Sequence, residues 1–93
     1  MIEIDREVDR YYDSNAAVRM EDPLKERIIL IDKENSPSTV VWNPWIEKAA
    51  ALGDLPNEDY LAFACVETAV TNDRAVALSK DETHRFATRI SVE

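Results

Sequence analysis

The side chain best suited to chemistry in this sequence is Glu67, a carboxylate that directly follows an apolar segment. The odd-numbered positions of that segment are apolar: Leu61, Phe63 and Cys65. Glu67 continues this series, and a carboxylate on a buried face must find partners or shift its pKa upward. In a cleft at the end of a strand, it would serve as a general base for proton transfer. The simpler alternative is that the strand ends at Val66 and Glu67 points into water, and the pattern alone leaves both open.

The other side chains that could carry chemistry have structural explanations. Cys65 is the single cysteine, cannot form an internal disulfide, and is interpreted as a small buried hydrophobic residue. His84 is the single histidine and lies in a polar turn, so we interpret it as a surface residue. Trp42 and Trp45 could stack against a sugar ring, but tryptophans more often anchor a core, which is our interpretation of both.

Most elements that must position these residues are predicted to be short strands. Apolar, β-branched and aromatic residues recur between turn residues and predict strands at 16–20, 27–32, 39–42, 60–66, 75–78 and 86–92. The segments 27–32 and 39–42 could form a hairpin. The segment 27–32 is apolar on both faces, which is typical of a strand covered on two sides.

One short helix is predicted near residues 44–52. Asn43 can accept a hydrogen bond from a free amide of the first turn, and Pro44 suits the first helical position. Gly53 is expected to end the helix in the left-handed conformation. The fold class is therefore all-β, mainly antiparallel, with one short helix. Because the strands need more covering partners than the chain offers, residues 1–93 are interpreted as a single segment of a larger β-sandwich.

The charge of the chain excludes several partners. Eleven Lys and Arg residues face 19 Asp and Glu residues in 93, for a formal net charge of -8. Such a surface repels phosphate backbones and anionic lipid, so we expect neither a nucleic-acid nor a membrane partner. The lone cysteine fits a reducing compartment, and neither a signal peptide nor a membrane-length apolar stretch is present. We therefore expect a soluble, cytoplasmic protein.

Two motifs add a resemblance to this interpretation. The first is the string Thr39-Val40-Val41-Trp42-Asn43-Pro44-Trp45-Ile46-Glu47-Lys48-Ala49, and the second is Cys65-Val66-Glu67. With these motifs the chain resembles the hexose-6-phosphate mutarotases (glucose-6-phosphate 1-epimerases) of the galactose-mutarotase-like superfamily, over nearly its whole length. The resemblance implies that residues 1–93 are the C-terminal part of an aldose 1-epimerase-like domain, one piece of a large β-supersandwich.

The resemblance also implies roles for two carboxylates. Glu67 corresponds to the general base, and Asp9 to a carboxylate that binds the sugar, although Asp5 and Asp13 lie near and stay open as alternatives. The base takes the proton of the anomeric hydroxyl while an acid protonates the ring oxygen, so the ring opens and can reclose as the other anomer. No metal or organic cofactor is needed. Thr68 departs from the family pattern, in which Pro or a small residue more often follows the base.

The resemblance further implies that the site is incomplete in this chain. The family's general-acid histidine and its phosphate-binding arginines precede this segment, and His84 has no counterpart role, so we expect the chain alone to be inactive. The implied partners are a sugar-phosphate substrate and either the missing N-terminal part of the domain or a self-associated copy. The alternative is a non-catalytic carbohydrate-binding or dimerisation module derived from the same fold. An unrelated small acidic β protein would require the Trp-Asn-Pro-Trp string to be a coincidence.

Overall fold

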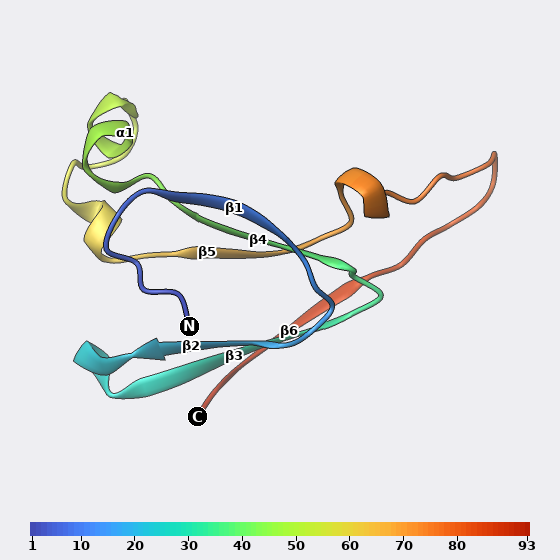
Figure 1. The fold of residues 1–93 in the computed structure, drawn as a ribbon, viewed down its shortest axis with the longest axis horizontal. Coiled ribbons are helices and arrows are strands. Elements are labelled where there is room, and N and C mark those ends of the chain that lie inside the picture. Colours follow the sequence, from blue (N-terminus) through green and yellow to red (C-terminus); the bar gives the residue numbers. More distant parts are fainter. The chain divides into compact units, whose positions relative to one another are not determined.

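The computed structural model describes all of residues 1–93 and contains six strands and one α-helix (Figure 1). The strands are β1 (Val8–Asp13), β2 (Val18–Asp22), β3 (Arg27–Glu34), β4 (Ser38–Asn43), β5 (Cys65–Ala69) and β6 (Ala87–Val92). The helix α1 is Trp45–Ala51, and short 3₁₀ helices lie at Pro23–Lys25, Asp59–Leu61 and Asn72–Arg74. The predicted fold class, all-β with one short helix, is confirmed.

The strands form two three-stranded sheets, in the orders β1-β4-β5 and β2-β3-β6. In the second sheet, β3 pairs antiparallel with β2 on one edge and with β6 on the other. The predicted hairpin between residues 27–32 and 39–42 is wrong, because β3 and β4 belong to different sheets. Both edges of β3 are already occupied by β2 and β6, so no edge is left for β4.

The chain divides into two compact units. The first contains residues 1–11 and 40–67, and the second contains residues 12–39 and 68–93. The buried hydrophobic residues are few: Val8, Val41 and Ala49 in the first unit, and Ile31 in the second. Because burial of apolar surface is the main stabilising term, so small a core predicts low stability for the chain by itself.

One face of the sheet β2-β3-β6 is apolar across all three strands. Its register forms two apolar rows across the three strands, Met20-Ile29-Val92 and Val18-Ile31-Ile90. Alternate residues of a strand point to the same face, so these six side chains share one face. Ile31 is buried on the central strand, whereas Ile90 and Val92 on β6 are 67% and 64% exposed. The apolar face is therefore covered at β3 and open at β6.

Several predicted elements need correction. The strand predicted at 60–66 is wrong for most of its length, since a 3₁₀ helix occupies Asp59–Leu61 and β5 begins only at Cys65. The strand predicted at 75–78 is absent: the segment joins neither sheet, and the exposure of Val76 and Leu78 leaves no apolar contact to hold it against one. The strand predicted at 16–20 lies two residues later, whereas those at 27–32, 39–42 and 86–92 are confirmed as β3, β4 and β6.

Candidate functional site

Glu67 lies at the centre of β5, and its side chain is exposed. The buried carboxylate that the odd-numbered series predicted is therefore not observed. The series fails because its early members precede the strand, and only Cys65 shares β5 and its face with Glu67. Burial raises the pKa of the half-buried Cys65 thiol, and the negative charge of Glu67 raises it further. Glu67 thus presents a carboxylate to solvent and acts electrostatically on its neighbour along the strand.

Asp9 lies on β1, exposed, on the same sheet as Glu67. The strand β4 separates β1 from β5, so the two strands run about 10 Å apart, twice the usual strand spacing. Lys48 lies near Asp9: a 2.5 Å ion pair with Glu7 raises the pKa of Lys48, and the charge of Asp9 raises it further. The side chains of Asp9 and Lys48 are therefore close enough to interact electrostatically.

The two alternative carboxylates are engaged by arginines. Asp5 pairs with Arg6 at 2.9 Å, and this contact lowers the pKa of Asp5. Asp13 pairs with Arg74 at 2.9 Å. A carboxylate held by an arginine is less available to a sugar hydroxyl, because its oxygens already accept charge-assisted hydrogen bonds. Of the three aspartates, Asp9 is thus the one best placed to accept from a ligand.

A buried asparagine organises the segment between the helix and β5. Asn43 ends β4 and is fully buried. Its amide donates to the carbonyl oxygens of Tyr60 and Phe63, at 2.9 and 2.7 Å, and its side-chain oxygen accepts from the Trp45 N–H at 2.9 Å. The predicted acceptor role of Asn43 is confirmed. The two donor contacts were missed, because no sequence pattern shows which distant carbonyls an amide will reach.

Both tryptophans pack against aromatic residues of the same segment. The Trp42 ring lies 5.9 Å from that of Phe63, and the Trp45 ring meets Tyr60 edge-on at 4.9 Å. These contacts support their interpretation as packing anchors. The left-handed residue of this region is Trp45, with φ of 59°, and not Gly53 as predicted. For a bulky residue this conformation is strained, and the hydrogen bond from its N–H to Asn43 helps to hold it.

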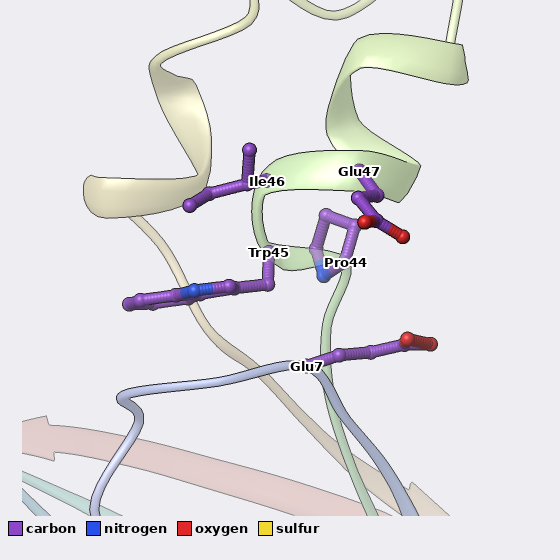
Figure 2. Close-up of a pocket in the computed structure, with 5 residues that line it drawn as sticks. All are labelled: Glu7, Pro44, Trp45, Ile46 and Glu47. Carbon is purple, nitrogen blue, oxygen red and sulfur yellow. The ribbon is translucent and has the colours of Figure 1, made fainter.

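Neither of the two hollows described next is lined by Asp9 or Glu67. Figure 2 shows a hollow of about 250 Å³ lined by Glu7, Pro44, Trp45, Ile46 and Glu47, in which both carboxylates turn to the same side, away from the indole ring. A second hollow of about 350 Å³ lies at the turn between β2 and β3. Ligand sites are usually concave and bury most of the ligand, whereas Asp9 and Glu67 are both exposed.

His84 is half-buried, its Nε2 lies 3.3 Å from the Asn35 carbonyl oxygen, and its ring lies 6.0 Å from that of Phe86. No group of three or more His, Cys, Asp or Glu side chains is arranged to hold a metal ion. None of the helices has the length and apolar character needed to cross a membrane.

Comparison with known proteins places this chain in a family. The sequence model of the aldose 1-epimerase family matches residues 2–91. The chain belongs to the aldose 1-epimerase family. The predicted resemblance is thereby confirmed, and the two three-stranded sheets agree with an all-β fold of this family.

Two relatives of this aldose 1-epimerase family chain carry the provisional name glucose-6-phosphate 1-epimerase. A Cenchrus ciliaris protein is 33% identical over 85 residues, which are 90% of this chain and 26% of the relative. An Escherichia coli (strain K12) protein is 30% identical over 63 residues, which are 68% of this chain and 21% of the relative. The chain therefore spans about a quarter of the length of these curated relatives. No solved structure matches it significantly.

Proposed function

We propose that this chain supplies the base-bearing part of a hexose-6-phosphate 1-epimerase, with Glu67 as general base and Asp9 as a sugar-binding carboxylate. The observation that carries the proposal is the match to the aldose 1-epimerase family over residues 2–91. The provisional names of two relatives point to glucose 6-phosphate as the substrate. Assignment of Glu67 and Asp9 rests on their motif positions in this sequence.

The chemistry of anomer exchange suits a carboxylate in the position of Glu67. The base removes the proton from the anomeric O1 hydroxyl while an acid protonates the ring oxygen. The C1–O5 bond then breaks, and O1 becomes the aldehyde oxygen. Rotation about C1–C2 and attack of the C5 hydroxyl on the other face of the aldehyde close the opposite anomer, with both protons returned. Each proton-transfer partner contributes about 10²–10⁴-fold to the rate.

The position of Asp9 supports its part in this proposal. Asp9 and Glu67 lie on strands of one sheet with only β4 between them, and both are exposed. A hexose bound across β4 could present its ring hydroxyls to Asp9 and its anomeric hydroxyl to Glu67. In this proposal Asp9 accepts hydrogen bonds from the ring hydroxyls and takes no part in proton transfer.

We propose that the acid for the second proton transfer lies outside residues 1–93. His84 bonds to the Asn35 carbonyl, and the proposal assigns no acid among residues 1–93. The cytoplasmic location also stays a prediction, for which the lone cysteine is the support.

The direct test is the exchange between the α and β anomers of glucose 6-phosphate, followed by two-dimensional exchange NMR. With the 93-residue chain alone, we expect the rate of the buffer at the same phosphate concentration, because base catalysis without the acid and without an enclosed site gives little acceleration. Clear acceleration that Glu67→Gln leaves unchanged would overturn the proposal. Acceleration that Glu67→Gln abolishes would support Glu67 as the general base and contradict only the proposal that the acid lies outside this chain.

The second candidate is a non-catalytic carbohydrate-binding or dimerisation module of the same fold. The observation that favours it is the exposure of the apolar residues Ile90 and Val92 on β6. Sedimentation of the chain discriminates between the two. A tight symmetric dimer that binds sugar without exchanging its anomers would favour the module over the enzyme.

A further inference from the structure

A lysine lies beside the proposed sugar-binding carboxylate. The Lys48 ammonium pairs with Glu7 at 2.5 Å, and the Lys48 side chain is 59% exposed. Glu7 immediately precedes β1 and Asp9 lies two residues later, so in an extended chain both side chains point to the same side. The hydrogen bond with Glu7 and the charge of Asp9 raise the pKa of Lys48, in agreement with an ammonium close to both carboxylates. Lys48 therefore lies at the Asp9 end of the candidate site, where a ligand can reach it.

The neighbouring arginines are less well placed than Lys48. Arg6 pairs with Asp5 at 2.9 Å. Arg10 directly follows Asp9 on β1, and successive residues of a strand point to opposite faces, so Arg10 points away from the face of Asp9. Of the cationic side chains around the start of β1, Lys48 is thus the one that lies on the side of Asp9.

The charge of the proposed substrate calls for a nearby cation. A phosphate monoester carries about -1.5 to -2 charges at pH 7. The chain has a formal net charge of -8, and both proposed site residues are acidic. Repulsion between the phosphate and these acidic groups weakens binding unless a local positive charge offsets it. An ammonium is a compact charge with three donors, so Lys48 suits a phosphate oxygen.

We propose that Lys48 contacts the phosphate of the bound hexose 6-phosphate and thereby selects phosphorylated over free hexose. This inference rests on the proposed function, which places the sugar across β4 between Asp9 and Glu67. Lys48 adds to the phosphate-binding arginines that the family resemblance implies outside residues 1–93. In the free chain Glu7 holds the ammonium. Glu7 therefore competes with the phosphate for Lys48, and this pair tunes how strongly the site prefers a phosphorylated sugar.

The test measures binding of glucose 6-phosphate and of glucose to a chimaera in which this chain replaces the matching segment of the Cenchrus ciliaris relative. Titrations followed by amide chemical shifts give both dissociation constants without relying on catalysis. Lys48→Gln removes the ammonium, and Glu7→Gln removes its partner. Lys80→Gln, at an exposed position, is the matched control for the loss of one positive charge. Circular dichroism checks that each variant folds like the parent.

We expect Lys48→Gln to weaken binding of glucose 6-phosphate by about five- to tenfold and binding of glucose by less than about twofold, because only the phosphate meets the ammonium. Glu7→Gln should tighten binding of glucose 6-phosphate by about two- to fivefold, since it frees Lys48 for the phosphate. Lys80→Gln should change neither constant. High salt should diminish the effects of Lys48→Gln and Glu7→Gln, because salt screens exposed charges.

The opposite signs of the two effects separate a phosphate contact from a structural ion pair, which either substitution would break equally. Equal effects of Lys48→Gln and Glu7→Gln, an equal loss for both sugars, or unchanged binding in Lys48→Gln would overturn the inference, as would a chimaera that binds neither sugar. The rate of anomer exchange judges the proposed function separately. Selection for phosphate through Lys48, together with a rate that Glu67→Gln leaves unchanged, would keep the binding role of Lys48 and reject Glu67 as the base.

Discussion

Replacement of the buried Asn43 is expected to destabilise the first unit strongly. Asn43→Ala removes three hydrogen bonds and leaves the Trp45 N–H and the carbonyl oxygens of Tyr60 and Phe63 without their partner. A typical hydrogen bond contributes about 1 kcal/mol net, and an unsatisfied buried group costs about 1–3 kcal/mol. Because water can reach some of these groups once the side chain is gone, the expected loss is about 3 kcal/mol. That is a large share of the roughly 5 kcal/mol at the low end for small domains.

The assay is urea denaturation, followed by circular dichroism and by tryptophan fluorescence. Trp45 packs on Tyr60 and Trp42 on Phe63, so the emission reports on the segment that Asn43 holds. The matched control is Asn57→Ala, since Asn57 is exposed and should change the free energy of unfolding by less than about 0.5 kcal/mol. If Asn43→Ala changed the free energy of unfolding as little as Asn57→Ala, the reasoning would be refuted, because the three hydrogen bonds of Asn43 would then contribute nothing to stability.

The variant Asn43→Asp adds a pH test to the same site. The carboxylate keeps the acceptor for the Trp45 N–H but replaces both donors, so it meets the carbonyl oxygens of Tyr60 and Phe63. Burial and these oxygens raise the folded-state pKa above the unfolded value of about 3.9. A raised acid pKa contributes stability below the unfolded pKa and loses it as pH rises through the folded pKa. The destabilisation relative to the natural sequence should therefore be larger at pH 7 than at pH 4, and the opposite order would contradict the assignment.

Three further predictions concern other parts of the chain. Lys33 Nζ donates to the carbonyl oxygens of Ser14 and Ser38 at 2.6 and 2.8 Å. In urea denaturation, Lys33→Met should therefore lower the free energy of unfolding by about 1–3 kcal/mol, whereas Lys80→Met at an exposed position should leave it almost unchanged. Equal effects of the two substitutions would refute this role of Lys33. Because burial and the charge of Glu67 raise the pKa of Cys65, its alkylation by iodoacetamide at pH 8 should be slower than that of a free thiol and should accelerate in Glu67→Gln. An unchanged rate in that variant would place the two side chains out of electrostatic contact. The buried Ser36 hydroxyl donates to the Ala69 carbonyl oxygen and accepts from the Ala69 N–H. Ser36→Ala should therefore lower the free energy of unfolding by about 1–3 kcal/mol and speed hydrogen exchange of the Ala69 amide. An Ala69 amide that stays protected in this variant would argue against the contact.

The sequence predicted those elements whose patterns are local. β3 and β4 are dense in β-branched and aliphatic residues between clear turns, and both were predicted almost to their ends. The helix was predicted near 44–52 and observed at Trp45–Ala51 for the same reason. β1 was not predicted as a strand, because charged residues interrupt its sequence and only Val8 is buried.

The sequence could not predict features that depend on distant partners. The alternation from Tyr60 to Val66 has the period of a strand, but the side chain of Asn43 takes the carbonyl groups of Tyr60 and Phe63 that a sheet would need. Strand pairing could not be predicted from the sequence either. A hairpin of β3 with β4 was expected, yet β2 and β6 occupy the two edges of β3.

The candidate site was found through its motif, and its geometry was only partly predictable. The pattern left open whether Glu67 is buried at the end of a strand or points into water; it is exposed in mid-strand, because β5 starts five residues after the start of the predicted strand. That Asp9 lies two strands from Glu67 follows from the sheet order β1-β4-β5, which local periodicity does not encode. The roles of both carboxylates as base and sugar ligand stay predictions.

The most direct measurement is the rate of anomer exchange of glucose 6-phosphate by a chimaera in which the aligned part of this chain replaces the matching segment of the Cenchrus ciliaris relative. Glu67→Gln should lower the rate by about 10²–10⁴-fold, the usual contribution of a general base, without preventing the chimaera from folding. The exposed Glu58→Gln is the matched control and should leave the rate unchanged. A Glu67→Gln chimaera that exchanges anomers as fast as the control would contradict the assignment of the base.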